Sequence, residues 1–189
     1  MLVRIDPSTN TIAQTMPAPR GADNLGYGFG TVGVSHVPLQ GDFGIYRVDP
    51  TTGAVLADIA ILGGPFKIRS AFGSMWTSGV EPDPGAVAGS PNGGALFETL
   101  NRIDPATNTV VAKIPYAAVA MDWHTDFVEA AGSLWISSKT ALLVRIDPTQ
   151  NRVVDRYLPS TGGGGVATDG QAVWFTGWDD AQLHRLPLG

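Results

Sequence analysis

The sequence contains no cysteine, which excludes disulfides, thiolate metal sites and cysteine nucleophiles. Only 15% of its residues are charged, and no basic cluster exists that could neutralise a phosphate backbone, so we expect no nucleic-acid partner. No apolar run approaches the roughly 18 residues that a membrane span requires. The first residues have neither the basic leader nor the apolar core of a signal peptide. We therefore expect no membrane span, while the compartment stays open.

Glycine and proline are abundant instead, with 24 and 14 residues, and 43% of the chain is hydrophobic. This composition is typical of a globular protein built from many short strands joined by turns, not of a helical or disordered one. A length of 189 residues allows one domain with a substantial core. We predict an all-β fold in a single domain, residues 1–189.

A turn-rich phrase occurs four times along the chain. The copies are VRIDPSTNTIA from Val3, YRVDPTTGAVL from Tyr46, NRIDPATNTVV from Asn101 and VRIDPTQNRVV from Val144. Proline presets the backbone at the first turn position, aspartate accepts backbone N–H bonds, and the asparagine or glycine suits a left-handed position. The phrase predicts a hairpin that joins the third and fourth strands of a repeating unit, and LHRLPLG near the C-terminus is a degraded fifth copy.

A second phrase, centred on tryptophan, precedes the arginine of most copies. It reads FGSMWTSG from Phe72, GSLWISS from Gly132 and GQAVWFTG from Gly170, while FGTVGVSH from Phe29 has Gly33 in place of tryptophan. Short apolar runs rich in Val, Ile and Trp and bounded by turn residues indicate four strands in each unit. Four antiparallel strands that repeat every 40 to 45 residues or so predict the blade of a β-propeller.

The repeat predicts a little over four blades. Residues 1–19 supply the third and fourth strands of a first blade, residues 20–62, 63–116 and 117–159 form full blades, and residues 160–189 form a last partial blade. Three interpretations remain open: a small closed propeller, a homo-oligomer that completes one ring, or a fragment of a longer propeller. An open ring would expose the apolar faces of its end blades and should associate.

Residues that recur in every copy are expected to be structural. We predict that the repeat arginines stack on an aromatic ring or pair with a carboxylate, and that Trp76, Trp135 and Trp174 pack between blades. His184 lies within a strand and is expected to be structural as well.

Function is expected where the copies differ, on the face that carries the connections between second and third strands and the links between blades. These segments are acidic, which suits a divalent cation, Mg²⁺ or Ca²⁺, or a cationic ligand. MDWHTDF, residues 121–127, is the most unusual of them. The predicted ligand-binding residues are Trp123, Asp126, Asp42, Trp178 and Asp179; the predicted metal ligands are Asp122, His124 and Asp126; the catalytic candidates are His124 and His36. A small molecule or a protein is the expected partner at this variable face.

RIDPATNTVVAKIP, coupled to AAGSLWISS, resembles the YVTN-repeat and virginiamycin B lyase-like bacterial propellers over almost the whole chain. The resemblance implies six or seven blades, full-length relatives that are secreted or periplasmic, and a Mg-dependent lyase that uses paired histidines with a nearby glutamate. Here the histidines are scattered and no Glu-x-His occurs. The leading prediction is therefore a ligand- or protein-binding module. The alternatives are a metal-dependent lyase and a structural fragment without activity of its own.

Overall fold

The computed structural model describes residues 1–36, 43–82, 96–118, 125–138, 143–157 and 163–189. All regular secondary structure in these ranges is β, in seventeen strands. The described residues accordingly include no helix long and apolar enough to cross a membrane.

The strands form five antiparallel sheets in chain order. The first is a hairpin of β1 (Leu2–Asp6) and β2 (Thr11–Met16). Three four-stranded sheets follow: β3 (Ala22–Gly28), β4 (Thr31–His36), β5 (Gly44–Val48) and β6 (Val55–Ala60); β7 (Pro65–Ala71), β8 (Ser74–Pro82), β9 (Leu96–Asp104) and β10 (Thr109–Ala118); β11 (Asp126–Ala130), β12 (Ser133–Ser137), β13 (Leu143–Asp147) and β14 (Arg152–Tyr157). The last sheet has three strands, β15 (Gly163–Thr168), β16 (Ala172–Gly177) and β17 (Gln182–Pro187).

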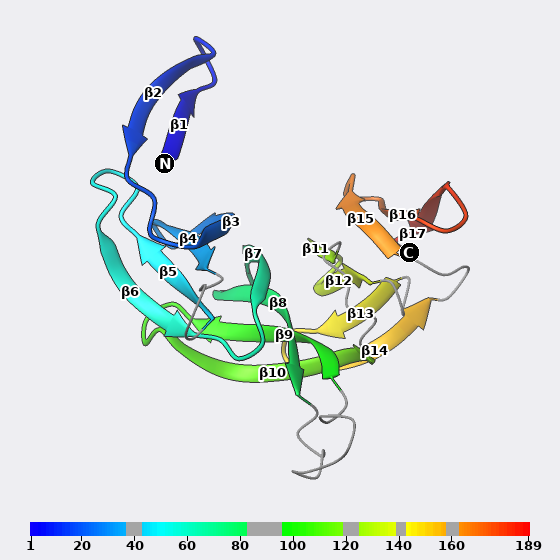
Figure 1. The fold of residues 1–189 in the computed structure, drawn as a ribbon. Helices are drawn as coiled ribbons and strands as arrows, with labels where there is room; N and C mark the ends of the chain where they lie inside the picture. Colours follow the sequence, from blue (N-terminus) through cyan, green and yellow to red (C-terminus); the bar gives the residue numbers. More distant parts are fainter. Residues whose placement is uncertain (37–42, 83–95, 119–124, 139–142, 158–162) are drawn as a thin grey trace.

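The sheets follow one another around an open arc (Figure 1). Strands β3, β7, β11 and β15 lie on the concave side, where those of neighbouring sheets contact one another, and β6, β10 and β14 lie on the outer side. Radial repetition of four-stranded antiparallel sheets is the architecture of a β-propeller. The prediction of an all-β propeller built from four-stranded antiparallel blades is confirmed, and the arrangement is consistent with a partial propeller.

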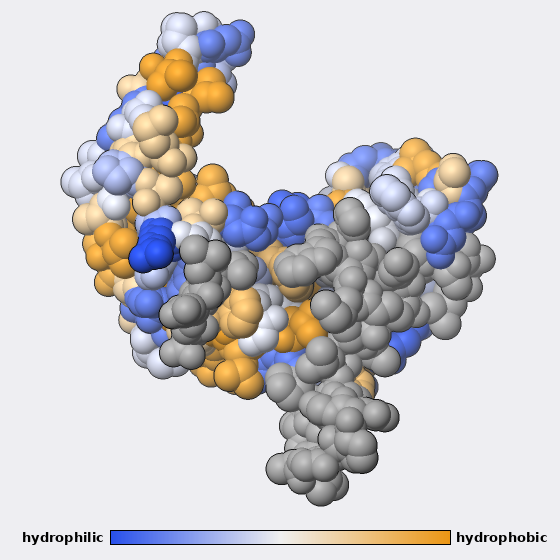
Figure 2. Space-filling view, viewed as in Figure 1, coloured by the Kyte–Doolittle hydropathy of each residue, from blue (hydrophilic) through white to orange (hydrophobic). Residues whose placement is uncertain are grey.

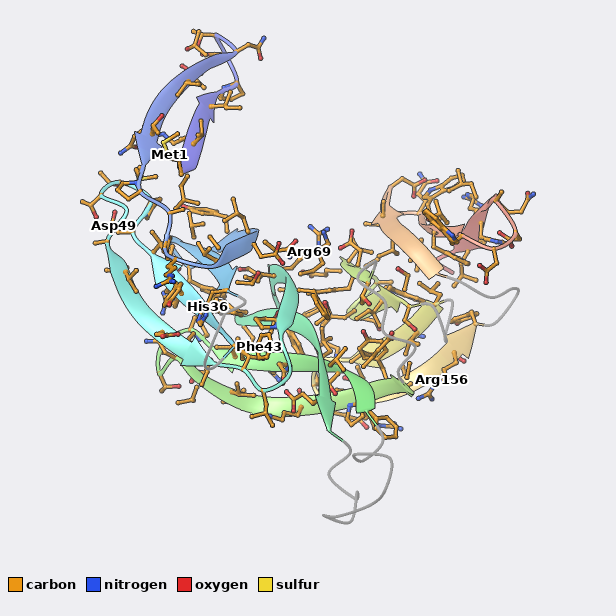
Figure 3. All side chains as sticks on the ribbon, in the orientation of Figure 1. Met1, His36, Phe43, Asp49, Arg69 and Arg156 are labelled. Carbon is orange, nitrogen blue, oxygen red and sulfur yellow. The ribbon has the colours of Figure 1, made fainter. Side chains whose placement is uncertain are left out.

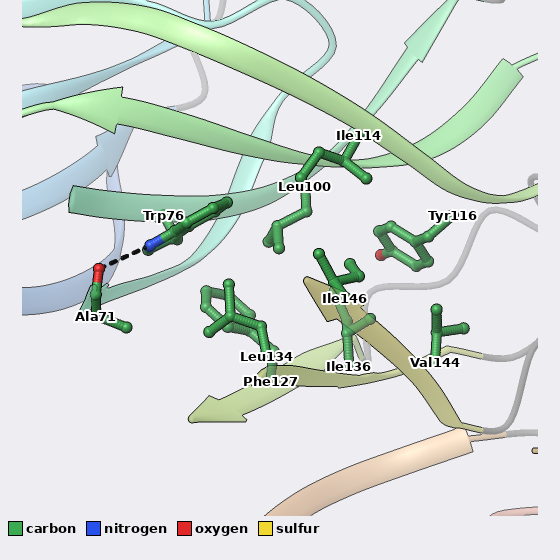
Figure 4. Close-up of a cluster of buried hydrophobic side chains, with 10 residues drawn as sticks. All are labelled: Ala71, Trp76, Leu100, Ile114, Tyr116, Phe127, Leu134, Ile136, Val144 and Ile146. Carbon is green, nitrogen blue, oxygen red and sulfur yellow. Dashed lines mark hydrogen bonds between the residues drawn. The ribbon is translucent and has the colours of Figure 1, made fainter. Parts of the chain in front are cut away.

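The hydrophobic core lies between the sheets. In the largest cluster, Trp76 and Leu100 of the β7–β10 sheet pack against Phe127 and Ile146 of the β11–β14 sheet, and all four are completely buried (Figure 4). Similar clusters join the other neighbouring sheets. Because each sheet buries its faces only against its neighbours, a sheet at the end of the arc has one uncovered face.

The Asp-Pro turns have the predicted construction. The carboxylate of Asp104 accepts a 2.7 Å bond from the backbone N–H of Ala106, and Asp147 accepts one of 2.8 Å from Thr149. The bond from Ala106 lowers the pKa of Asp104, and the hydroxyl of Thr149, together with the backbone N–H groups of Gln150 and Thr149, lowers the pKa of Asp147. Asn108 takes the left-handed conformation with φ 58°, and Gly53 takes it in the second copy with φ 77°.

Three of the repeat arginines stack on the tryptophan ring of their own sheet. Arg102 lies over the ring of Trp76 at 5.3 Å, and two further pairs, Arg145 with Trp135 and Arg185 with Trp174, have a separation of 5.5 Å. Arg47 departs from the prediction of a stacked or carboxylate-paired guanidinium. The sheet of Arg47 has Gly33 at the tryptophan position, and its Nε donates to the hydroxyl of Thr31 at 3.2 Å.

Candidate functional site

The variable face begins where β4 and β8 end and where β9 and β11 start, away from the Asp-Pro turns. Of the predicted site residues, His36, Asp126, Trp178 and Asp179 belong to the described part of the chain. The other four, Asp42, Asp122, Trp123 and His124, lie outside the described residues. The predicted metal site of Asp122, His124 and Asp126 therefore stays a prediction. Elsewhere in the described ranges no group of three or more His, Asp or Glu side chains is gathered as a metal site.

His36 ends strand β4 and is 6% exposed. Its ring stacks on Tyr46 with centroids 4.1 Å apart, and its Nε2 lies 3.1 Å from Oδ1 of Asp58. A side chain at position 44 would press on this imidazole, because a Cβ on Gly44 would come within 2.6 Å of Nε2. Stacking, the carboxylate and the glycine thus fix the ring in one orientation. An imidazole oriented by a carboxylate can serve as a base or as a ligand.

Asp126 starts the inner strand β11 and joins two neighbouring sheets. Its Oδ1 accepts a 2.9 Å bond from the guanidinium of Arg69 on β7 and a 2.8 Å bond from the backbone N–H of Phe127. Figure 3 shows Arg69 between β7 and β11 on the concave side of the arc. The charge of Asp126 is therefore already compensated, and a cation bound there would compete with Arg69.

Trp178 and Asp179 lie on the turn between β16 and β17, in a different sheet from His36 and Asp126. The Trp178 side chain is 71% exposed, so it offers a large apolar surface to a partner. On the adjoining strand, His184 stacks on Phe175 at 5.1 Å, and its Nε2 lies 2.9 Å from Asp180. His184 is held inside its own sheet, as expected of a structural residue.

The described structure adds a cluster of buried polar side chains along one face of the β7–β10 sheet, from Asn101 in the middle of β9 to Glu81 at the end of β8 that continues into the variable face. Glu81 is 6% exposed, and its Oε2 accepts a 2.7 Å bond from the ammonium of Lys113. Asn101, which pairs with Lys113 in the sheet register, is completely buried. Neither the amide nitrogen nor the amide oxygen of Asn101 has a hydrogen-bond partner, and the same holds for Oε1 of Glu81.

Buried polar atoms without partners are uncommon, since each costs about 1 to 3 kcal/mol. The sequence does contain a signal for this cluster. Asn101 stands directly before the repeat arginine, at the position that Val3, Tyr46 and Val144 occupy in the other copies. The sequence prediction placed function only in the loops between strands, so it did not include Asn101, a polar residue within the repeat itself.

The opposite face of the same sheet carries buried polar groups as well. Tyr116 and Glu98 are 2% and 1% exposed. Burial, helped by the negative charge of Glu98, raises the pKa of the Tyr116 hydroxyl well above its ordinary value, while a hydrogen bond with Thr125 opposes the shift. This phenol stays protonated and can donate. The β7–β10 sheet thus carries buried polar groups on both faces, Asn101 and Glu81 on one and Glu98 and Tyr116 on the other.

Three solved structures are similar to this chain in fold. A computationally designed protein, Ika4, superposes with a TM-score of 0.67 at 10% identity, over 93% of this chain and 96% of the designed one. The dihydro-heme d1 dehydrogenase NirN gives 0.62 at 13% identity, over 99% of this chain and 42% of its own. Hydrazine synthase from Kuenenia stuttgartiensis gives 0.53 at 15% identity, over 94% of this chain and 53% of its own.

NirN and hydrazine synthase are β-propeller proteins, and this chain spans about half of their length or less. At these identities the likeness concerns the fold alone. The chain matches no protein-family model and no curated protein. The molecule is a β-propeller module.

Proposed function

We propose that this propeller module binds a small polar ligand at the variable-face end of the β7–β10 sheet. The observation that carries the proposal is the pair of unfilled groups in that sheet, the amide of Asn101 and Oε1 of Glu81. A ligand that donates to the carboxylate and both donates to and accepts from the amide would satisfy all three atoms. Oε1 of Glu81 lacks a donor, whereas Oε2 is already paired with Lys113, so this carboxylate favours a ligand that brings an N–H donor, such as an amine, or a divalent cation.

The proposal is tested by calorimetric titration with Ca²⁺, with Mg²⁺ and with a panel of small primary amines. We expect one of these probes to bind, and we expect Glu81→Gln and Asn101→Val each to weaken that binding tenfold or more. Asn101→Val is a conservative change for the fold, because valine occupies the equivalent positions 3 and 144. Glu129→Gln, on β11, is the matched control. Binding that neither variant weakens would refute this site.

A metal-dependent lyase is the second candidate, and the carboxylate-oriented ring of His36 supports it. This activity requires a divalent cation bound through histidine. His36→Ala and His124→Ala should then abolish Mg²⁺ binding while leaving amine binding at Glu81 intact. Mg²⁺ binding that survives both substitutions would contradict the lyase.

Protein recognition by the same face is tested separately with Trp123→Ala and Trp178→Ala. A partner protein that contacts these indoles should lose affinity for both variants. Trp178→Ala should leave the melting temperature of the module within about 2 °C of the wild type, since the exposed Trp178 side chain contributes little to stability.

A further inference from the structure

Neighbouring sheets are joined by one repeated contact. Arg47 donates to the backbone carbonyl of Pro105 and, at 2.6 Å, to the side-chain oxygen of Asn108. Arg102 makes the same two bonds one sheet further along, to Pro148 at 2.8 Å and to Asn151 at 3.1 Å. At these two junctions, the arginine of one sheet therefore binds the Asp-Pro turn of the next sheet.

The same junctions bury the apolar residues of the third strand. Strands β1 and β13 have the identical sequence LVRID. In β13, Val144 and Ile146 are completely buried in the cluster that includes Trp76 of the preceding sheet. In β1, the equivalent Val3 and Ile5 are 48% and 62% exposed. Figure 2 shows hydrophobic side chains at the surface of this hairpin.

At the other end of the arc, the β15–β17 sheet has the arginine side of the same contact, the side that donates to a neighbouring turn. Arg185 lies over Trp174 at 5.5 Å, in the arrangement that Arg102 and Trp76 have at an internal junction. Trp76 is completely buried by the sheet that follows it, whereas Trp174 is only half-buried and Leu183 is 64% exposed. The Trp174 and Arg185 face therefore has the residues that cover the following sheet at an internal junction, but in a single chain no described sheet packs against it.

We propose that two copies of this chain associate head to tail. The Trp174 and Arg185 face of one copy covers Val3 and Ile5 on the β1–β2 hairpin of the other. The hairpin presents the turn that an arginine grips elsewhere, because Asn10 has φ 54°, close to the 58° of Asn108. Arg185 then donates to the carbonyl of Pro7 and to the side chain of Asn10 in the second copy.

This contact is heterologous, since a hairpin meets a three-stranded sheet. Two copies that each offer both surfaces can close one ring through two such contacts. The association rests on surfaces distinct from Asn101 and Glu81, so the binding proposal and this one can fail independently.

Light scattering coupled to size exclusion tests the association. We expect the wild type to have twice the 19.8 kDa mass of one chain. Ile5→Asp and Leu183→Asp should each give monomers, because every contact needs one hairpin and one covering face. Both positions are exposed, so circular dichroism should show unchanged folds. Val111→Asp, at a position 54% exposed on β10, is the matched control and should leave the dimer intact.

Mixing the two monomeric variants provides the decisive measurement. Each retains the surface that the other has lost, so a mixture should form a one-to-one dimer through a single intact contact. Arg185→Ala should weaken the dimer tenfold or more. A monomeric wild type, a dimer unaffected by Ile5→Asp and Leu183→Asp, or a mixture that remains monomeric would each overturn the proposal.

Discussion

Arg102 on β9 donates to the side-chain oxygen of Asn151, 3.1 Å away in the next sheet, while its guanidinium lies over Trp76 of its own sheet. One residue thus connects the face of one blade to the turn of the following blade. The contact explains why arginine recurs: its planar group can stack and donate at the same time, which a lysine ammonium cannot.

Replacing Arg102 should destabilise the junction between two blades. Arg102→Ala removes bonds to Ser74, Pro148 and Asn151 and the stacking on tryptophan. Hydrogen bonds from a charged donor contribute about 1.5 to 3 kcal/mol each. Because the contacts of one residue are not additive, we expect the free energy of unfolding to fall by about 3 kcal/mol in total. Urea unfolding measures this.

The matched control is Arg152→Ala. Arg152 is exposed and bonds only to Gln150 in its own turn among the described residues, so we expect a loss below about 0.5 kcal/mol. Equal losses for the two arginines would contradict the role of the contact between sheets. Arg102→Lys should retain less than half of the stability that Arg102 contributes.

Asn151 combines two separable roles, because it holds a left-handed conformation at φ 51° and accepts from Arg102. Asn151→Gly keeps the turn and loses only the bond, as in the copy that has Gly53. Asn151→Ala loses both. We expect the alanine variant to be less stable than the glycine variant by about 1 kcal/mol in urea unfolding, and the reverse order would refute the conformational role.

An internal sheet and the last sheet of the arc should respond differently to loss of their tryptophan. Trp76→Ala empties a completely buried site and should cost about 3 to 5 kcal/mol. In samples dilute enough to contain single chains, Trp174→Ala removes a half-buried ring and should cost less than half as much. Thermal unfolding of both variants measures the difference. Equal losses would mean that Trp174 is covered in solution, which the association of two copies predicts for concentrated samples and not for dilute ones.

Much of the fold could be predicted from the sequence because the copies repeat the same local signals. Residue types within the segment are enough to predict the turn of Asp104 and Asn108. The same is true of the strand around Trp76. The site was less predictable. Burial of Asn101 and Glu81 depends on the register of β8 and β9 and on the packing of neighbouring sheets, and neither is encoded locally. The pairing of Asp126 with Arg69 also joins residues far apart in the chain.

Acid should weaken the last sheet through Asp169. Its carboxylate accepts from the indole of Trp174 at 2.9 Å and from the backbone N–H groups of Gln171 and Ala172, and these bonds lower its pKa from 3.8 to about 2. A carboxyl whose pKa is lower in the folded state stabilises that state above the unfolded pKa. The stabilisation should be complete above about pH 4 and lost as the pH falls through 2.

Asp169→Asn tests this sign. At pH 7 the variant should melt below the wild type, and the difference should shrink as the pH falls from 4 and vanish near 2. Other turn aspartates with lowered pKa values, such as Asp6 and Asp49, weaken both proteins alike in acid, so the difference between the two melting curves isolates Asp169. Asp179→Asn, an exposed change on the next turn, is the control. A difference that stays constant from pH 7 to 2 would show that the carboxylate charge does not stabilise this turn.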